Sequence, residues 1–303
     1  MKNQQKAYFF ALVTVMLWST MSTAFKLTLG LIRFDNLLFW SVLFAMVSVG
    51  ILMFFEGKFS LLFKVTKSQL WLSALLGLIN PFGYYLVLFK AYELLQAQEA
   101  GVLNYTWPVI LVILSAIFLK QKIGWLSMSA IIVSFVGLLI ISTKGNIFGL
   151  KFQHPTGILL AVGSAFLWAT YWILNMKDTR EGTSKIFLNL FFGTIYILIY
   201  MLVFSKIAIP SVKGFFGAFY IGTFEMGITF VLWMMALNYS VTTAKVSNLI
   251  FLSPFIALLF IRIFVGEKIL PSTILGLALI ITGILMQQMK QLKKWSTKTI
   301  NQH

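Results

Sequence analysis

The sequence divides into ten apolar stretches separated by short polar segments. They cover roughly residues 7–29, 36–55, 70–91, 98–119, 125–142, 157–175, 186–204, 214–237, 243–265 and 271–289. A helix of about 20 apolar residues crosses a bilayer core about 30 Å thick. Backbone polar groups in lipid must be satisfied within their own segment, so each stretch is predicted to be helical. We therefore predict an all-α integral membrane protein with ten transmembrane helices.

The composition excludes a soluble domain of ordinary kind, because 59% of the residues are hydrophobic and only 11% are charged. Soluble domains are about half apolar and about a quarter charged. The first stretch carries polar residues from Trp18 onward and lacks a small-residue cleavage site, so we expect a retained helix and not a signal peptide.

The net charge of +16 suggests nucleic acid at first glance, but loop lysines and arginines that set membrane topology explain it better. More of the 24 basic residues fall on the side that holds both termini if ten helices are present. We therefore expect both termini in the cytoplasm and no nucleic-acid partner. The basic tail, residues 290–303, is expected to be cytoplasmic, where anionic lipid headgroups attract such segments.

The chain contains no cysteine, and its two histidines are His154, in a loop, and His303. Disulfides, thiolate metal ligands and a histidine site within the membrane are therefore not expected, and neither is a cofactor. The sequence GxxxxGK[ST], which binds nucleotide phosphates, is absent, so direct use of ATP is not indicated.

An internal repeat appears when the chain is shifted by about 146–150 residues. "AFLWATYW" (165–172) matches "VMLWSTMS" (15–22), and "PFIALLFIRIFVGEKIL" (254–270) matches "PVILVILSAIFLKQKIG" (108–124). We predict a first five-helix repeat at 1–143, a central loop at 144–156 and a second repeat at 157–289. Five is an odd number, so the repeats would be inverted, as in many secondary transporters with alternating access and a midplane binding site.

Particular motifs resemble a known family. Two five-helix halves and the "GEK" turn at 266–268 resemble EamA-type proteins of the drug/metabolite transporter superfamily; the matching turn, 120–122, reads "KQK", with Gln121 in place of Glu267. "LWSTM" (17–21) and "EAGVLNYTWP" (99–108) resemble, more narrowly, bacterial aromatic amino acid exporters. The resemblance implies a ten-helix basket in the bacterial inner membrane, with a central cavity for amino acids or similar metabolites.

The polar segment that begins the fourth stretch is one candidate binding site. Pro108 lacks an amide hydrogen and disfavours helix at Trp107, so a helix break is predicted there. Asn104, Tyr105 and Trp107 could hold a planar or cationic metabolite by stacking, cation–π contact and hydrogen bonds. The alternative is that the two aromatic residues belong to an interfacial belt.

Other aromatic residues and prolines are further candidates. Tyr84 and Tyr85 follow Pro81 in "NPFGYY" (80–85), where Pro81 and Gly83 predict irregular backbone. Trp18 and Trp168 occupy matching positions of the two repeats. Pro254 matches Pro108 and could also mark a break. Because 16% of the chain is aromatic, each such ring could instead face lipid or pack in the core.

Glu225 is the acidic residue that lies well inside an apolar stretch. A charge at membrane depth is costly and indicates a functional site, here for a proton or a substrate ammonium group. Its counterpart in the first repeat is Asn80. Alternatively, Glu225 is interfacial or pairs with Lys245.

Five glycines with small neighbours, Gly137, Gly157, Gly163, Gly276 and Gly283, are expected to permit close helix packing.

The favoured function is a secondary transporter for a small molecule, and the resemblance implies export of aromatic or other neutral amino acids or related metabolites. One alternative is export of amphipathic cationic drugs through the same aromatic cavity. An intramembrane lipid-modifying enzyme is a further alternative, but the clustered carboxylates or histidines that such chemistry requires are absent. The sequence leaves the oligomeric state open.

Overall fold

The structure is a computed structural model, and it describes residues 3–118, 124–146, 154–175, 178–241, 246 and 248–300. The described residues form helices, turns and loops, without a strand. The first half of the chain contains α1 (Gln4–Leu29), α2 (Phe34–Phe55), η1 (Phe59–Lys64), α3 (Lys67–Gly77), η2 (Leu78–Gly83), α4 (Tyr84–Leu94), α5 (Ala97–Asn104), α6 (Trp107–Phe118) and α7 (Trp125–Ser142). The second half contains α8 (Pro155–Asn175), α9 (Gly182–Phe204), α10 (Val212–Tyr220), η3 (Ile221–Gly227), α11 (Ile228–Tyr239), η4 (Asn248–Leu252), α13 (Ser253–Phe260), η5 (Ile261–Val265) and α14 (Pro271–Ile300).

Six helical segments of the described chain are long and apolar enough to cross a membrane. They are Gln4–Leu29, Phe34–Phe55, Lys67–Leu94, Pro155–Asn175, Gly182–Phe204 and Val212–Tyr239. Shorter apolar helices cover Met128–Ser142, Leu249–Val265 and Pro271–Met286. The chain is thus an all-helical, multi-pass membrane protein, and the count of ten spans stays a prediction.

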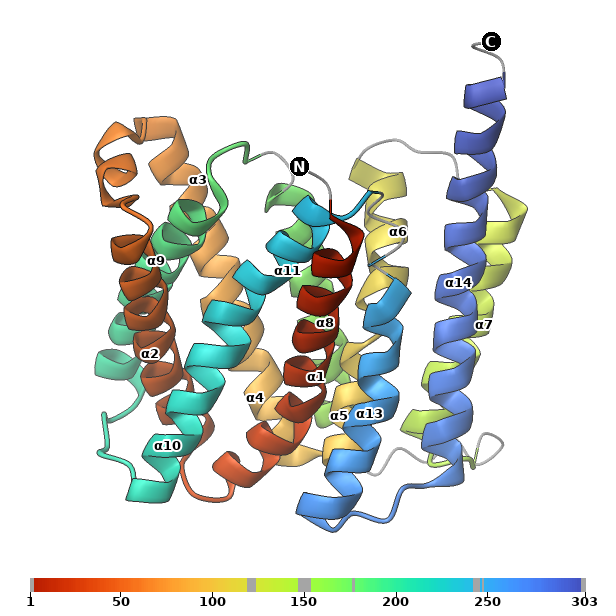
Figure 1. Cartoon of the computed structure of the whole chain (residues 1–303). Coiled ribbons are helices and arrows are strands. Elements are labelled where there is room, and N and C mark those ends of the chain that lie inside the picture. The colour runs from red at the N-terminus through yellow and green to blue at the C-terminus, as the bar shows by residue number, and fades with distance from the viewer. Residues whose placement is uncertain are drawn as a thin grey trace.

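The helices stand side by side in one bundle, and α1 begins at the same end of the bundle at which α14 finishes (Figure 1). The packing partners occur in matching pairs: α1 packs on α11 as α8 packs on α4. Similarly, α2 packs on η3 as α9 packs on η2, and α1 packs on α13 as α8 packs on α6. The final helix of each half, α7 and α14, pack on each other. Each half therefore completes the packing of the other.

Two spans are interrupted by wider, π-helical turns, η2 and η3. In η2, Asn80 has an extended backbone (φ −146, ψ 118), and the following Pro81 cannot donate a helical hydrogen bond. Glu225 lies within η3, well inside the segment Val212–Tyr239. The helix therefore does not start after Glu225, as one alternative required, and the depth of Glu225 in the membrane stays a prediction.

Glycines let both interruptions lie directly against a neighbouring helix. A Cβ atom on Gly77 would lie 2.6 Å from the backbone oxygen of Asn189 in α9, and one on Gly222 would clash with the backbone oxygen of Ser41 in α2. Side chains at these two positions would force the helices apart, so the irregular turns are fixed at the contact between the halves.

The fourth apolar stretch forms two helices, α5 and α6, with Tyr105 and Thr106 between them. Pro108 lies in the first turn of α6, where the missing amide hydrogen costs little. Pro254 likewise lies in the first turn of α13, directly after the 3-10 helix η4. The expected tail, residues 290–303, does not begin where the last helix ends, since α14 continues as a helix to Ile300.

Candidate functional site

Aromatic rings from both halves meet in one cluster. Trp168 of α8 lies 4.7 Å from Tyr84 of α4, 5.8 Å from Tyr171 and 5.7 Å from Phe230 of α11, measured between ring centroids. Tyr84 in turn lies 4.6 Å from Tyr85. Rings at these separations attract one another beyond simple burial of apolar area, and their faces are suited to planar or cationic ligands.

Trp18 of α1 joins the cluster at its edge, 6.2 Å from Phe230 and 5.7 Å from Trp233. Its counterpart by repeat position, Trp168, contacts the same Phe230 ring. The structure therefore brings four of the sequence candidates, Trp18, Tyr84, Tyr85 and Trp168, into one continuous aromatic assembly.

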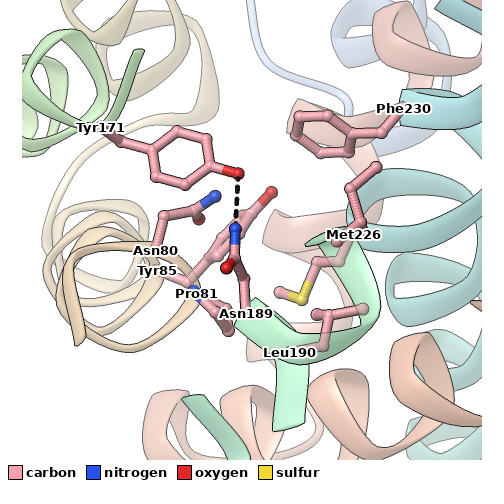
Figure 2. Close-up of a pocket in the computed structure, with 9 residues that line it drawn as sticks. Asn80, Pro81, Tyr85, Tyr171, Asn189, Leu190, Met226 and Phe230 are labelled. Atoms are coloured by element: carbon pink, nitrogen blue, oxygen red, sulfur yellow. Dashed lines mark hydrogen bonds between the residues drawn. The ribbon is translucent and has the colours of Figure 1, made fainter. Parts of the chain in front are cut away.

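A small cavity of about 20 Å³ lies beside this cluster (Figure 2). Its lining comes from α4, α8, α9, α11 and the two π-helical turns: Asn80, Pro81, Tyr85, Tyr171, Ile186, Asn189, Leu190, Met226 and Phe230. Pockets that hold a metabolite are typically about 300–1,000 Å³. In this conformation the cavity thus offers a space little larger than one water molecule.

Polar groups are concentrated at the cavity although it is buried in an apolar bundle. The Tyr85 hydroxyl donates a hydrogen bond of 3.2 Å to Oε1 of Glu225, whose other oxygen has no partner. The Asn189 amide nitrogen donates to the Tyr171 hydroxyl at 3.4 Å, as Figure 2 shows. Oδ1 of Asn189 and Oδ1 of Asn80 are also buried without a partner. Unsatisfied buried oxygens are costly and indicate a site where something else binds.

Glu225 does not line the cavity itself but contacts it through the Tyr85 hydroxyl. The alternative partner considered for it, Lys245, lies outside the described residues, as does the "KQK" turn at 120–122.

The residues around the break between α5 and α6 lie next to this site but do not line the cavity. Asn104 accepts a hydrogen bond from Tyr84 at 3.2 Å and donates to Ser164 at 2.9 Å. Tyr105 donates to the backbone oxygen of Ile250 at 2.6 Å, which links the two halves. Trp107 is half-buried and packs on the main apolar core. Asn104 therefore supports the aromatic cluster through Tyr84, whereas Tyr105 and Trp107 pack on the larger apolar core to which the cluster belongs.

Sequence reasoning missed six lining residues: Tyr171, Ile186, Asn189, Leu190, Met226 and Phe230. Asn189 could have been found, because it is an amide inside the apolar stretch 186–204, as Glu225 is a carboxylate inside its own. The other five are aromatic or apolar residues among many, and only the packing of α8, α9, η3 and α11 distinguishes them.

Comparisons with known proteins place these features in a family. The EamA-like transporter family matches residues 5–143 and again residues 155–287. The uncharacterised transporter YyaM of Bacillus subtilis (strain 168) is 25% identical over 265 residues, which is 84% of either chain. The aromatic amino acid exporter YddG of Escherichia coli (strain K12) is 29% identical over 189 residues, 59% of this chain and 61% of that exporter.

A solved crystal structure superposes with a TM-score of 0.67 at 18% sequence identity, over 95% of this chain and 98% of that one. Identity this low shows a shared fold and nothing about the substrate. The two family matches together cover nearly the whole chain and include both interrupted spans. The chain belongs to the EamA-like transporter family.

Proposed function

We propose that this protein is a secondary transporter that exports aromatic or other neutral amino acids, or closely related small metabolites, by alternating access. The observation that carries the proposal is the meeting of an aromatic cluster and a buried polar cavity at the contact between the two halves. Stacking surface together with a few hydrogen-bonding groups suits an amino acid with an aromatic side chain. The similarity to YddG supports this substrate class and the outward direction.

The proposed architecture is ten spans in two inverted five-helix repeats, with both termini in the cytoplasm and the protein in the bacterial inner membrane. The matching packing partners of the two halves support the repeat. The common end at which α1 begins and α14 finishes supports an even number of crossings (Figure 1). A cavity of about 20 Å³ cannot hold an amino acid, so transport requires the halves to move apart around it.

In this proposal Glu225 is the group that interacts with the positive charge of the cargo or with a transported proton. Its buried carboxylate lies one hydrogen bond from the cavity, where it could attract a substrate ammonium group or carry a proton. The driving force would be the substrate gradient in the first case and a proton gradient in the second.

Uptake into liposomes tests the proposal. Purified protein is reconstituted, and entry of labelled tryptophan, phenylalanine and leucine is followed with and without a pH gradient. Saturable uptake that exceeds protein-free liposomes is expected for tryptophan and phenylalanine. Absence of uptake for all three amino acids in folded protein would contradict the substrate class.

Export of amphipathic organic cations is a second candidate, and the position of Glu225 behind aromatic rings favours it. Inhibition of phenylalanine uptake by a quaternary ammonium compound is the corresponding assay. Inhibition stronger than that of unlabelled phenylalanine would favour the cation exporter.

A further inference from the structure

Two of the polar side chains that line the cavity beside the aromatic cluster, Asn80 and Asn189, carry an amide oxygen that can only accept hydrogen bonds. Oδ1 of Asn80 and Oδ1 of Asn189 have no partner, and their side chains belong to residues that are 7% and 2% exposed. The hydroxyl oxygen of Tyr85 lies in the same lining and uses its hydrogen for Glu225. These three acceptors outnumber the one free hydroxyl hydrogen of the lining, that of Tyr171, so a ligand that brings hydrogen atoms would satisfy them.

The amide orientations follow from Tyr171. Asn189 directs its nitrogen to the Tyr171 hydroxyl, and the Asn80 amide lies beside the same hydroxyl group (Figure 2). Both amides therefore have a fixed neighbour on the nitrogen side, which leaves the oxygen of each available for a ligand. The site is built by packing from three elements, η2, α8 and α9.

The size of the cavity limits the group that can enter. A volume of about 20 Å³ slightly exceeds the roughly 10–15 Å³ that one water needs, which is also the space of a primary ammonium group. A trimethylammonium group is several times larger and has no N–H to donate. In this conformation the cavity thus fits –NH₃⁺ and is too small for a quaternary nitrogen.

One side chain connects the cavity to a carboxyl group. The Tyr85 hydroxyl bridges the cavity and Glu225, so an ammonium group bound at Tyr85 would lie one hydroxyl from this buried carboxyl group, whose ionised form it would stabilise. The Tyr171 and Phe230 rings line the same space and add cation–π attraction.

We propose that Asn80, Asn189 and Tyr85 bind the primary ammonium group of the cargo, so that the substrate class is an aromatic primary amine or α-amino acid. This inference rests on the proposed transport function and narrows it. The aromatic side chain of the cargo would then lie against Trp168 and Phe230, which become accessible when the cavity opens.

Four compounds with the same ring separate the contributions of the cargo groups. L-phenylalanine carries ammonium and carboxylate, 2-phenylethylamine carries only ammonium, 3-phenylpropionate carries only carboxylate, and trimethyl(2-phenylethyl)ammonium carries charge without N–H. Binding to purified protein in lipid nanodiscs is measured by competition against labelled L-phenylalanine. We expect 2-phenylethylamine to bind within about tenfold of phenylalanine and the last two compounds to bind at least about tenfold more weakly.

Two variants test the assigned residues. Asn189→Leu keeps the number and branching of the side-chain heavy atoms but removes the acceptor, and it is expected to weaken the binding of 2-phenylethylamine about tenfold while leaving the binding of 3-phenylpropionate unchanged. Ser41→Ala is the matched control, because Ser41 is also buried with an unpartnered oxygen, faces the other interrupted span and does not line the cavity. It should bind all four compounds as wild type does.

Equal binding of 3-phenylpropionate and phenylalanine would overturn the ammonium pocket and leave aromatic transport standing. The ammonium pocket would also be overturned if the Asn189→Leu variant, shown to be folded by its thermal unfolding transition, bound 2-phenylethylamine as wild type does. Failure of all four compounds to bind to folded wild-type protein would instead overturn the proposed function together with this inference.

Discussion

Trp168 links the rings of the candidate site, because it contacts Tyr84, Tyr171, Trp172 and Phe230. Aromatic pairs contribute roughly 0.5–1.5 kcal/mol each beyond burial of their area. We therefore expect Trp168→Leu to lower liposome uptake of phenylalanine at least about tenfold.

The control for this change is Trp125→Leu, since Trp125 is 83% exposed on the outer surface of α7. Thermal unfolding of both variants separates loss of binding from loss of folding. Equal uptake by the two variants, both folded, would remove Trp168 from the site.

The Asp178 carboxylate, in the connection between α8 and α9, is expected to make stability sensitive to acid. Burial would raise its pKa, but hydrogen bonds from Arg180, the shortest 2.6 Å, outweigh burial and lower the pKa below its ordinary value. A lowered pKa in the folded state gives stability that is present above about pH 4 and is lost as the pH falls further.

The measurement is the thermal unfolding temperature between pH 7 and pH 3 for wild type and Asp178→Asn. The decrease below pH 4 should be smaller in the variant, because it has no carboxylate to protonate. Identical profiles would show that this ion pair does not contribute. Arg180 also donates to Ser73 of α3 at 2.6 Å, so the pair connects the two halves.

Close contacts between helices explain why glycine stands at most of the five positions that the sequence analysis named. A Cβ atom on Gly276 of α14 would lie 2.7 Å from the backbone oxygen of Gly137 in α7, and one on Gly283 would lie 2.6 Å from that of Ala130. Gly157 contacts Leu95 in the same way. The expectation of close packing is wrong for Gly163, where an added Cβ would meet nothing within 4 Å.

These two situations give opposite predictions for the same substitution. Gly276→Ala forces α14 away from α7 and should lower the thermal unfolding temperature in detergent. Gly163→Ala adds a methyl group into open space in α8 and should leave stability unchanged or raise it by about 0.4–1 kcal/mol. A destabilised Gly163→Ala together with a neutral Gly276→Ala would contradict the packing described here.

The interruptions of the spans illustrate what a sequence can reveal at this level. Pro81 and Pro108 predict irregular backbone because proline cannot donate a helical hydrogen bond, and the helices do change at 78–83 and between α5 and α6. No proline marks η3, which contains Glu225. Its turn depends on the contact of Gly222 with α2, which only the folded bundle provides.

One connection joins the two halves at the end of the bundle opposite to the start of α1. Gly266 has a left-handed backbone (φ 78), and the turn it makes places Glu267 at the first turn of α5. The Glu267 carboxylate accepts hydrogen bonds from the backbone of Ala97 at 2.8 Å and Gln98 at 3.2 Å. The Gln98 side-chain oxygen in turn accepts a hydrogen bond of 3.0 Å from the backbone nitrogen of Leu270.

Loss of this connection should open that end of the protein. Glu267→Ala removes an acceptor that satisfies helix-terminal amides, worth about 1 kcal/mol, or about fivefold in the balance between conformations. The chain has no cysteine, so a single Met226→Cys substitution reports access to the cavity. Labelling of this cysteine by a polar maleimide should be about fivefold faster in the Glu267→Ala background.

Glu93→Ala is the control, because Glu93 pairs with Lys90 of the same helix and does not connect the halves. Equal labelling rates in the Glu267→Ala and Glu93→Ala backgrounds would contradict a role for Glu267 in closure.

The membrane class and the family could be obtained from the sequence, because apolar stretches and the "GEK" turn are local features. The full set of site residues could not be obtained from the sequence, because they lie far apart along the chain, at Asn80, Tyr171, Asn189 and Phe230. Their proximity depends on how α8 and α9 pack against η2 and α4, and a sequence does not reveal such pairings. Aromatic residues are also too frequent here for type alone to separate the ring of a site from a ring in lipid.

The central claim is that cargo passes through the cavity between the halves, and a cysteine that blocks it tests this most directly. Met226→Cys protein in liposomes is treated with a bulky thiol reagent, and uptake of labelled phenylalanine is then measured. Met128→Cys, on the exposed face of α7, receives the same treatment as the control. The account predicts that modification abolishes uptake by Met226→Cys and spares Met128→Cys; undiminished uptake after complete modification at Met226→Cys would contradict it.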